Sequence, residues 1–374
     1  MKPIPRLPNV VAIASIVLAS GLPAQDALRA PSAKSEQSPV ATGDPATKMR
    51  GILVGERIAM MVAVAAELGV ADLLRDGPKS VEELASATKT HRPSLYRILR
   101  FLASHEIFSE DDDGRFRLTP TAELLRSDVP GSVRESARAL TRELSRGVAA
   151  NILNTVRTGK SAVEHAFGMS FFEYLAKDPV QQEAFNRQMA EGSRRIASQV
   201  VAAYDFSRTA KVVDIAGGQG ILLSHILKAH PRPTAVLFEL PSVVEEAKRT
   251  LDPAVLARAE LTSGDFFKSV PQGGDVYILK DIVHDWDDDR AVIILKNIRR
   301  AMSKRAKLLV IEGVVPKGNS PSLSKTMDVT MLMFTGGRER TETEHRNLLR
   351  AGGFRLNRLI PVSNGPFILE AAPE

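Results

Sequence analysis

An apolar run that breaks into a glycine-rich turn constrains the fold of this chain more than any other feature. Residues 211–220 read KVVDIAGGQG, and an apolar helical pattern follows from Ile221 to His230. Glycines at a strand-to-helix turn let the backbone approach a ligand closely and leave the N–H groups of the helix start free to bind it. The pattern therefore predicts a buried strand, a ligand-binding turn and a helix.

A second apolar strand is predicted from Thr234 to Leu240, and it carries an acid, Glu239, near its end. An acid about 20 residues beyond the glycine turn is where a Rossmann-type site hydrogen-bonds a ribose. We therefore expect the ligand to contain a nucleoside.

The spacing of the glycines indicates which nucleoside. A dinucleotide turn would need a third small residue at the position of Leu223, which is bulky. The pattern D-x-(G/A)-x-G-x-G instead fits at Asp214, Ala216, Gly218 and Gly220, with Gly217 between them. It resembles the S-adenosylmethionine loop of class I methyltransferases, with alanine at a frequent glycine position. We expect Ala216 to keep a negative φ, since a methyl group is tolerated there only in that conformation. A plain strand–turn–helix unit is the alternative.

Composition sets the broad class. The chain has 374 residues, of which 44% are hydrophobic and 25% charged, so it can bury a sizeable core, and its length predicts two domains. The net charge of +6 does not require nucleic-acid binding. The absence of cysteine excludes disulfides, thiolate metal sites and a cysteine nucleophile.

The first 48 residues have a different character from the rest. Lys2 and Arg6 precede an apolar run, Val10 to Ala19, and small residues follow up to Ala24. This is signal-peptide architecture in about residues 1–24, and the run is too short to span a bilayer comfortably. Residues 25–47 are rich in Ala, Ser, Pro and Thr, which predicts a disordered linker. The alternative is that the folded protein starts at Met49.

Residues 50–118 predict helices followed by a hairpin. Ser80 and Glu83 form a capping box, Pro93 starts a second helix, and residues 112–114 separate two short apolar strands. This order is that of a winged helix. One interpretation is DNA recognition by three arginines, Arg92, Arg97 and Arg100. We favour a packing module, because the acidic hairpin tip at residues 110–113 would repel phosphates.

The C-terminal half alternates strands and helices. Further strands are predicted at residues 260–262, 275–279, 306–313, 354–362 and 366–371, with a helix at residues 290–303. This pattern predicts a doubly wound seven-stranded sheet with an antiparallel member from the last hairpin. Polar clusters follow three of the strands: residues 264–267, residues 279–290 (LKDIVHDWDDDR) and Glu312. A further acid, Glu339, follows a Met-rich helix. Ligands bind at the carboxyl ends of strands in such sheets.

These motifs, taken together, resemble a known family. From about Arg50 to the end, the chain looks like the plant-type (caffeate, flavonoid and acetylserotonin) O-methyltransferases and their bacterial relatives. The motifs that carry the resemblance are VDIAGGQG, FELP, GDFF, LKDIVHDW, GGRERT and, upstream, GM…FEYL…DP. The resemblance implies a winged-helix-like dimerisation domain at residues 49–165 and an S-adenosylmethionine-binding α/β domain at residues 166–374. The apolar opening helices, Ile52 to Leu68, predict a homodimer, because they are more than one small domain needs to cover itself. Cofactor supply favours a cytoplasmic location, although the first residues leave export open.

The resemblance also implies roles for individual residues. The predicted cofactor site comprises Asp214, Gly217, Gly218, Gly220, Glu239, Asp265, Phe266, Lys280 and Ser193. His284 resembles the general base, flanked by the acids Glu312 and Glu339. Met169, Met189 and Met331 fall where relatives line the acceptor pocket. Glu239 departs from the family, in which aspartate is usual. The aromatic-rich segment from Phe167 to Met189 is equally compatible with core packing.

The predicted chemistry is consistent with these residue types. A phenol with a pKa of about 10 is mostly protonated at neutral pH, so a histidine that accepts its proton assists methyl transfer. The acids at residues 287–289 are expected to cap a helix rather than to bind a metal ion. Two other functions remain open: a ligand-responsive transcription regulator that uses the winged helix, and a methyltransferase-like protein that holds the cofactor as a passive ligand.

Overall fold

The computed structural model describes residues 44–363 and 365–374, and the chain divides into two compact units, residues 1–151 and 152–374. The signal-like segment lies outside the described residues. Helix α1 (Pro45–Glu67) begins inside the predicted linker, because the Asp44 carboxylate caps it by accepting a hydrogen bond from Thr47 N at 3.0 Å. Within the described ranges, no helix is both long enough and apolar enough to cross a membrane.

The first unit contains the predicted succession of two helices and a hairpin. These are α3 (Val81–Thr88), α4 (Arg92–Ala103), β2 (Phe108–Glu110) and β3 (Arg115–Leu118). A short strand β1 (Lys79–Ser80) pairs with β3 and completes a three-stranded sheet of order β1-β3-β2. The predicted capping box of Ser80 and Glu83 starts α3. The other helices are α2 (Val70–Leu73), α5 (Pro120–Glu123), α6 (Arg134–Ala139) and α7 (Glu143–Thr158), the last of which continues into the second unit.

Two of the three arginines considered for DNA recognition have partners within this unit. Arg92 forms an ion pair with Glu82, and the guanidinium of Arg100 lies 5.5 Å from the centre of the Tyr96 ring. These contacts favour the packing interpretation of the helices and hairpin.

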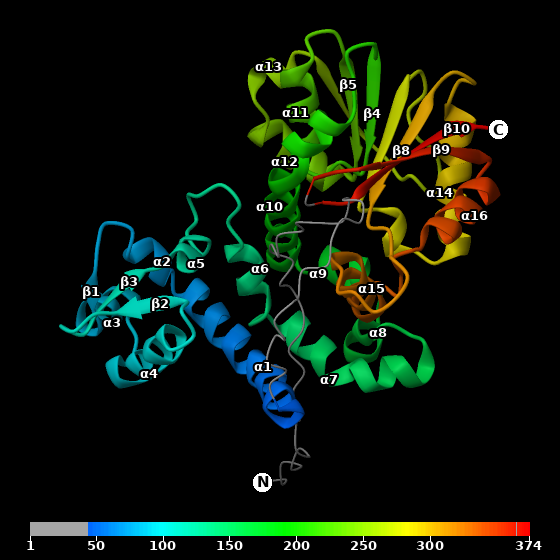
Figure 1. The fold of residues 1–374 in the computed structure, drawn as a ribbon. Helices are drawn as coiled ribbons and strands as arrows, with labels where there is room; N and C mark the ends of the chain where they lie inside the picture. Colours follow the sequence, from blue (N-terminus) through cyan, green and yellow to red (C-terminus); the bar gives the residue numbers. More distant parts are fainter. Residues whose placement is uncertain (1–43, 364) are drawn as a thin grey trace, which may run out of the picture. The chain divides into compact units, whose positions relative to one another are not determined.

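The second unit is built on the predicted seven-stranded sheet, which has the order β6-β5-β4-β7-β8-β10-β9 (Figure 1). The first five strands in this order are parallel, and β10 runs antiparallel to both β8 and β9. The strands are β4 (Lys211–Ile215), β5 (Thr234–Glu239), β6 (Ala259–Ser263), β7 (Val276–Lys280), β8 (Lys307–Glu312), β9 (Phe354–Pro361) and β10 (Phe367–Pro373). The helices are α8 (Ala162–Phe167), α9 (Phe171–Lys177), α10 (Pro179–Ala203), α11 (Ile221–Ala229), α12 (Pro241–Thr250), α13 (Pro253–Leu256), α14 (Asp288–Ala301), α15 (Leu323–Phe334) and α16 (Glu342–Ala351). A single 3₁₀ turn, η1 (Val283–Asp285), follows β7.

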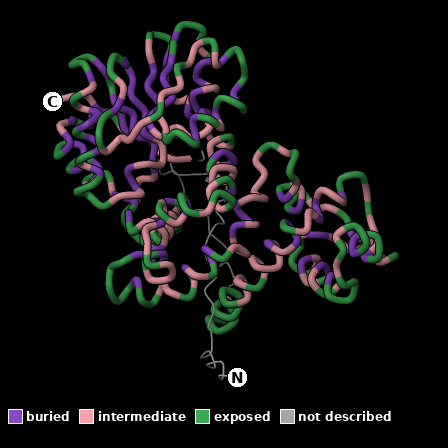
Figure 2. Tube along the Cα trace, turned by 180° about the vertical axis from the view of Figure 1, so that it is seen from behind, coloured by how far each residue is buried: buried purple, intermediate pink, exposed green. Residues whose placement is uncertain are grey.

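Helices cover both faces of this sheet, and the buried residues concentrate in its central strands (Figure 2). Successive side chains of a strand point to opposite faces. Val213 accordingly packs with α14 and α16, whereas Val212 packs with α10 and α11. This two-sided burial explains why the central strands β4, β5, β7 and β8 are largely apolar runs in the sequence. It leaves the carboxyl ends of the strands as the place for polar chemistry.

Candidate active site

The register of the parallel strands brings the predicted site segments to one edge of the sheet. Ile215, the last residue of β4, pairs with Phe238 on β5 and with Leu279 on β7. Lys280, the last residue of β7, pairs with Ile311 on β8. The glycine turn, Glu239, the His284 turn and Glu312 therefore follow neighbouring strands at the same edge.

The glycine turn has a conformation that differs from the prediction at one residue. Ala216 has a φ of +54°, so the expectation of a negative φ was wrong. The left-handed conformation costs an L-residue about 1–2 kcal/mol, and here a hydrogen bond of 2.7 Å from Ala216 N to the Phe238 carbonyl accompanies it. At Gly217, an added Cβ would lie 2.4 Å from Asp214 Oδ2, so this position requires glycine.

Two acids lie beside this turn. Glu239 accepts hydrogen bonds from Gly218 N at 3.2 Å and from Leu240 N at 2.6 Å, which fixes its carboxylate at the turn. Burial raises the pKa of Glu239, and these backbone hydrogen bonds oppose that rise. Asp214 is buried beneath the turn, and neither of its carboxyl oxygens has a hydrogen-bond partner among the described residues. Burial raises the pKa of Asp214 to about 7, against the opposing charge of Lys280.

The remaining predicted cofactor residues occupy the neighbouring loops. Asp265 Oδ1 accepts a hydrogen bond from Phe267 N at 2.8 Å and so shapes the turn after β6. The carbonyl of Phe266 in that turn accepts a hydrogen bond from Asn297 Nδ2 at 2.8 Å. Lys280 forms an ion pair with Asp281. Ser193 is half-buried on α10, and no hydrogen bond in the described ranges joins it to the glycine turn.

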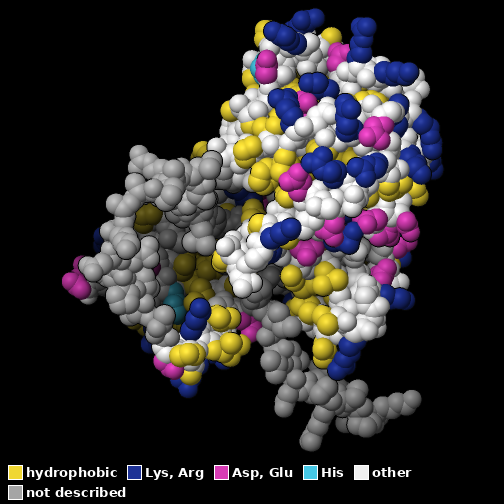
Figure 3. Space-filling model, turned by 45° about the vertical axis from the view of Figure 1, so that its right-hand side comes forward, with side chains coloured by type: hydrophobic (Ala, Val, Ile, Leu, Met, Phe, Trp, Pro, Cys, Tyr) yellow, Lys and Arg dark blue, Asp and Glu magenta, His cyan; other side chains and the backbone are white. Residues whose placement is uncertain are grey.

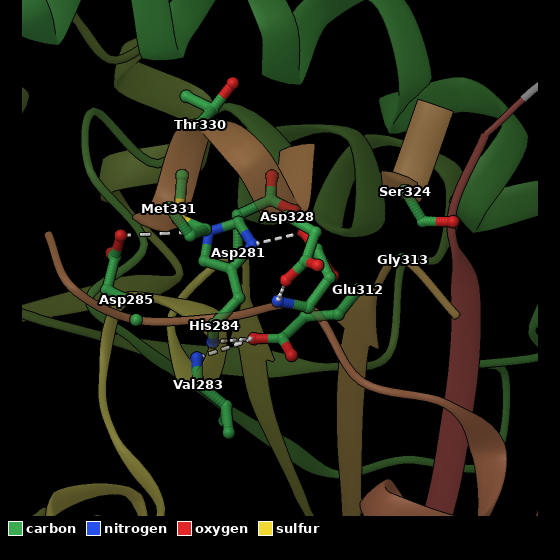
Figure 4. A network of polar contacts seen from close by, with 12 residues as sticks. Asp281, Val283, His284, Asp285, Glu312, Gly313, Ser324, Asp328, Thr330 and Met331 are labelled. Atoms are coloured by element: carbon green, nitrogen blue, oxygen red, sulfur yellow. Dashed lines mark hydrogen bonds and ion pairs between the residues drawn. The ribbon is translucent and has the colours of Figure 1, made fainter. Parts of the chain in front are cut away.

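A buried histidine and an acid form the centre of the second cluster. His284 lies on η1 with 5% of its surface exposed, and its Nδ1 is 2.7 Å from Glu339 Oε1. Figure 4 shows the ring among Asp281, Asp285, Glu312 and residues of α15. Because a carboxylate accepts a hydrogen bond from Nδ1–H, the neutral ring carries its lone pair on Nε2.

Among the described residues, no hydrogen bond or ion pair joins Glu312 to the ring of His284, so of the two acids expected to flank the ring only Glu339 has such a contact. Glu312 Oε1 instead accepts hydrogen bonds from the backbone nitrogens of Ile282, Val283 and His284 at 3.1, 2.5 and 3.1 Å (Figure 4). Its side chain reaches the start of η1, where the first N–H groups have no partner within the turn. Glu312 therefore fixes the backbone of the turn, and Glu339 orients the ring through Nδ1.

Asp285 is a member of the cluster that the sequence does not predict. Its Oδ1 lies 3.9 Å from His284 Nε2, whereas Glu339 contacts the other ring nitrogen. In the sequence it stands in an acid-rich run, and its residue type does not distinguish it from its neighbours. Its position directly after the candidate base is the one signal that could have identified it.

The charged groups of this cluster shift one another's pKa values. Burial opposes a positive charge on His284, but its hydrogen bond to Glu339 and the charges of Asp285, Glu339 and Glu312 outweigh burial and raise the pKa of the imidazole to about 10. Burial likewise raises the pKa values of Asp285 and Glu312, each to about 7. The cluster therefore favours the imidazolium form and stabilises a proton delivered to the ring.

The acids after this turn have helix-start and ion-pair roles. Asp287 is the N-cap of α14 and accepts a hydrogen bond from Arg290 N at 2.8 Å. Asp288 forms ion pairs with Arg338 and Arg340. Among the described residues, no group of three acidic or histidine side chains is arranged to hold a metal ion.

Aromatic side chains of the segment before the sheet pack against Trp286 and against α15. The rings of Phe172 and Trp286 stack with their centres 5.2 Å apart, and Phe171 meets Phe334 of α15 edge-on at 5.8 Å. Of the three predicted pocket methionines, Met331 is buried on α15, Met169 is half-buried and Met189 is 42% exposed on α10. Core packing thus accounts for part of this segment.

The sheet order, the glycine turn after β4 and the acid at the end of β5 define an S-adenosylmethionine-dependent methyltransferase of class I. The family comparison agrees with this fold. The chain belongs to the O-methyltransferase family: the O-methyltransferase domain matches residues 150–355, and the O-methyltransferase dimerisation domain matches residues 52–128. S-adenosylmethionine is the methyl donor of this family, and the chain is an O-methyltransferase by these relationships.

Individual relatives are similar over most of their length. The phenazine O-methyltransferase PhzM of Lysobacter antibioticus is 44% identical over 86% of this chain and 94% of its own. The mitomycin biosynthesis 6-O-methyltransferase of Streptomyces lavendulae is 39% identical over 84% of this chain and 90% of its own. A solved structure of NcsB1, an O-methyltransferase from neocarzinostatin biosynthesis in complex with S-adenosylmethionine and 2-hydroxy-5-methyl naphthoic acid, has a TM-score of 0.74. It is 32% identical and covers 91% of this chain and all of its own. These relationships give the transcription-regulator alternative no support.

Proposed function

We propose that this enzyme transfers the methyl group of S-adenosylmethionine to a phenolic hydroxyl of a small aromatic molecule, with His284 as the general base. The observation that carries the proposal is the 2.7 Å contact between His284 Nδ1 and Glu339, which leaves Nε2 as the proton-accepting nitrogen. The aromatic compounds named for the relatives support this acceptor class.

The residues at the glycine turn fit the cofactor. A carboxylate already fixed by backbone N–H groups, Glu239, retains lone pairs for ribose hydroxyls. An added Cβ at Gly218 would meet no atom within 4 Å, so the turn is open at that glycine. Asp265 and Phe266 are assigned to the adenine, Lys280 to the cofactor pocket, and Ser193 to the methionine end. When bound, S-adenosylmethionine supplies an electrophilic methyl group.

His284 has the proton-transfer role. Its Nε2 takes the proton of the acceptor hydroxyl as the oxygen becomes nucleophilic, and the Glu339 carboxylate stabilises the imidazolium that results. Asp285, 3.9 Å from Nε2, is placed to contact the same hydroxyl or a neighbouring polar group of the acceptor. Met169, Met189 and Met331 are assigned to the apolar wall of the acceptor pocket.

We further propose that the enzyme acts as a homodimer in the cytoplasm and without a nucleic-acid partner. The match to a dimerisation domain supports the dimer, and so do Ile52 and Leu53 on α1, which are 62% and 65% exposed. Figure 3 shows Asp and Glu side chains among the Lys and Arg side chains of the second unit, rather than a surface of one sign.

A labelled-methyl assay tests the reaction. The protein is incubated with S-adenosylmethionine that carries a labelled methyl group and with a panel of phenazines, naphthoates and hydroxybenzoates. Each phenol is paired with the analogue that has a methoxy group at the same position. We expect label transfer to the phenol and none to its methoxy partner. Transfer only to carboxyl or nitrogen atoms would contradict the proposal.

A further inference from the structure

Arg340 is a fully buried arginine whose guanidinium joins three segments of the site. Its exposed fraction is 0%, and it is the largest fully buried side chain in the described part of the protein. Its Nε and one terminal nitrogen donate hydrogen bonds to Asp288 Oδ1 at 3.0 and 2.8 Å. Asp288 lies in the first turn of α14 and is itself half-exposed, so the ion pair joins the buried guanidinium to a carboxylate at the surface.

The same guanidinium holds the backbone on both sides of the histidine. It donates hydrogen bonds to the Val283 carbonyl at 3.2 Å and to the Trp286 carbonyl at 2.9 Å. These two carbonyls flank His284 in the chain. A further hydrogen bond of 3.2 Å reaches the Arg338 carbonyl, so the guanidinium also fixes the segment of backbone that carries Glu339.

Two backbone contacts hold this segment against the histidine turn. Arg338 N donates a hydrogen bond to the His284 carbonyl at 2.8 Å. At Gly337, an added Cβ would lie 2.0 Å from the same carbonyl oxygen, so only glycine lets the two backbone segments come this close. The two segments are therefore held closely enough for Arg340 to reach both.

We propose that Arg340, together with Asp288, is a positioning residue for methyl transfer: it holds the turn that bears His284 at a fixed distance and orientation from the segment that bears Glu339. The inference rests on the proposed role of His284 as the base. Glu339 is the residue directly before Arg340, so a displaced guanidinium moves both partners of the His284–Glu339 contact. A planar guanidinium can reach a carboxylate and several carbonyls at once, which a lysine ammonium cannot do in a fixed geometry.

A positioning role predicts a change in the titration of His284 as well as in turnover. The titratable groups near this ring are Asp281, Asp285, Glu312, Glu339 and His345, and the charged Arg340 lies against the backbone carbonyls of Val283 and Trp286. The hydrogen bond that His284 Nδ1–H donates to Glu339 favours the imidazolium form. If Glu339 moves away from Nδ1, the pKa of His284 falls, and the rise of the rate with pH begins at a lower pH. A loss of folded protein alone would lower the amount of active enzyme and leave this profile in place.

The test compares two variants with matched controls. Arg340→Lys keeps the buried charge, and Asp288→Ala removes its partner at a half-exposed position. The conservative Asp288→Glu keeps a carboxylate, and Arg346→Lys makes the same change in an exposed arginine of α16 that pairs with Glu342 at 2.8 Å. Turnover per folded active site, the acceptor KM, the S-adenosylmethionine Kd by calorimetry and the pH–rate profile are measured for each.

We expect Arg340→Lys and Asp288→Ala to lower kcat by about 10- to 100-fold, since small misplacements of a catalytic group have effects of this size. Their cofactor Kd should stay within about two-fold of the wild type, because an interaction needed only in the transition state affects turnover and not ground-state binding. Their pH–rate step should move to lower pH, whereas Asp288→Glu and Arg346→Lys should keep the wild-type profile.

The outcomes separate this inference from the proposed function. If the wild-type profile has a step that His284→Ala removes, but Arg340→Lys leaves both kcat and that step unchanged, Arg340 is not a positioning residue. If Arg340→Lys lowers kcat without moving the step, its role is structural only, and the inference is also wrong. If His284→Ala removes no step, the assignment of the base fails first.

Discussion

Glu339 Oε1 lies 2.7 Å from His284 Nδ1, although the two residues are 55 positions apart in the chain. The contact joins the turn after β7 to the segment between α15 and α16. Glu339 is itself 5% exposed, and its second carboxyl oxygen has no hydrogen-bond partner among the described residues. The carboxylate is thus directed at the ring in a site with little water, where it stabilises an imidazolium more than it would at the surface.

The two acids near His284 should have separable effects. Glu339→Gln should lower turnover by about 10- to 100-fold and move the pH–rate step to lower pH, because the ring loses its charged partner. Glu312→Gln should mainly lower the melting temperature, because Glu312 binds the backbone of residues 282–284. Kinetics and thermal unfolding of both variants test this split. Equal kinetic effects with equal shifts of the step would contradict it.

The cofactor assignment predicts a binding defect at Glu239. Glu239→Ala should weaken S-adenosylmethionine binding by about 1.5–3 kcal/mol, the range for hydrogen bonds to a charged group. Isothermal titration calorimetry measures the affinity, and Glu245→Ala, a change in an exposed acid of α12, serves as the control. An unchanged affinity in Glu239→Ala would remove this residue from the site.

The buried Asp214 should make the cofactor-free protein less stable as the pH rises. Its folded-state pKa of about 7 lies above the ordinary aspartate pKa of 3.8, so the folded protein retains this proton to higher pH than the unfolded chain. The contribution of the protonated Asp214 to the free energy of unfolding is therefore fully present below a pH of 3.8, and it is lost as the pH rises through about 7. Asp214→Asn should be about 1–3 kcal/mol more stable than the wild type at about pH 8 and closer to it at about pH 5. Urea unfolding of both proteins at the two values of pH measures the difference in the free energy of unfolding. An Asp214→Asn variant that is less stable than the wild type at the higher pH would refute the assignment.

The exposed apolar residues at the start of α1 predict a dimer interface. Ile52→Asp together with Leu53→Asp should shift the protein to a monomer, because two charges replace apolar surface that the dimer would bury. Light scattering at micromolar concentration measures the mass of both forms. A wild-type protein that is already a monomer at this concentration would overturn the proposal of a homodimer.

Most of the fold could be predicted because it depends on local patterns. The central strands β4, β5, β7 and β8 are largely apolar runs between helical segments, and the glycine turn with Glu239 fixes where the ligand edge begins. The ends of the strands differ from the predicted ends by about one or two residues, because the hydrogen-bond ladder rather than hydrophobicity decides where pairing stops. The family resemblance supplied the roles of His284 and Glu339, which the sequence pattern alone left open.

What could not be predicted depends on the direction of individual side chains. The sequence places Glu312 and Glu339 at the same edge, but only the three-dimensional path shows that the first reaches backbone and the second reaches the ring. Arg340 looks like a surface residue in a charged segment, yet it is fully buried. The left-handed conformation of Ala216 was not predicted, because the intrinsic preference of alanine is overridden where the turn must enter α11.

The pH dependence of methyl transfer in the wild type and in His284→Ala tests the central claim most directly. The wild-type rate should rise with pH through a step above the ordinary histidine value of about 6.5, because the surrounding acids raise the pKa of His284. His284→Ala should bind S-adenosylmethionine with nearly unchanged affinity and turn over about 10²- to 10⁴-fold more slowly. Its remaining rate should follow the fraction of ionised acceptor, without the histidine step. A His284→Ala enzyme with wild-type turnover at a pH above the wild-type step would contradict the account and leave proximity of the bound reactants as the source of catalysis.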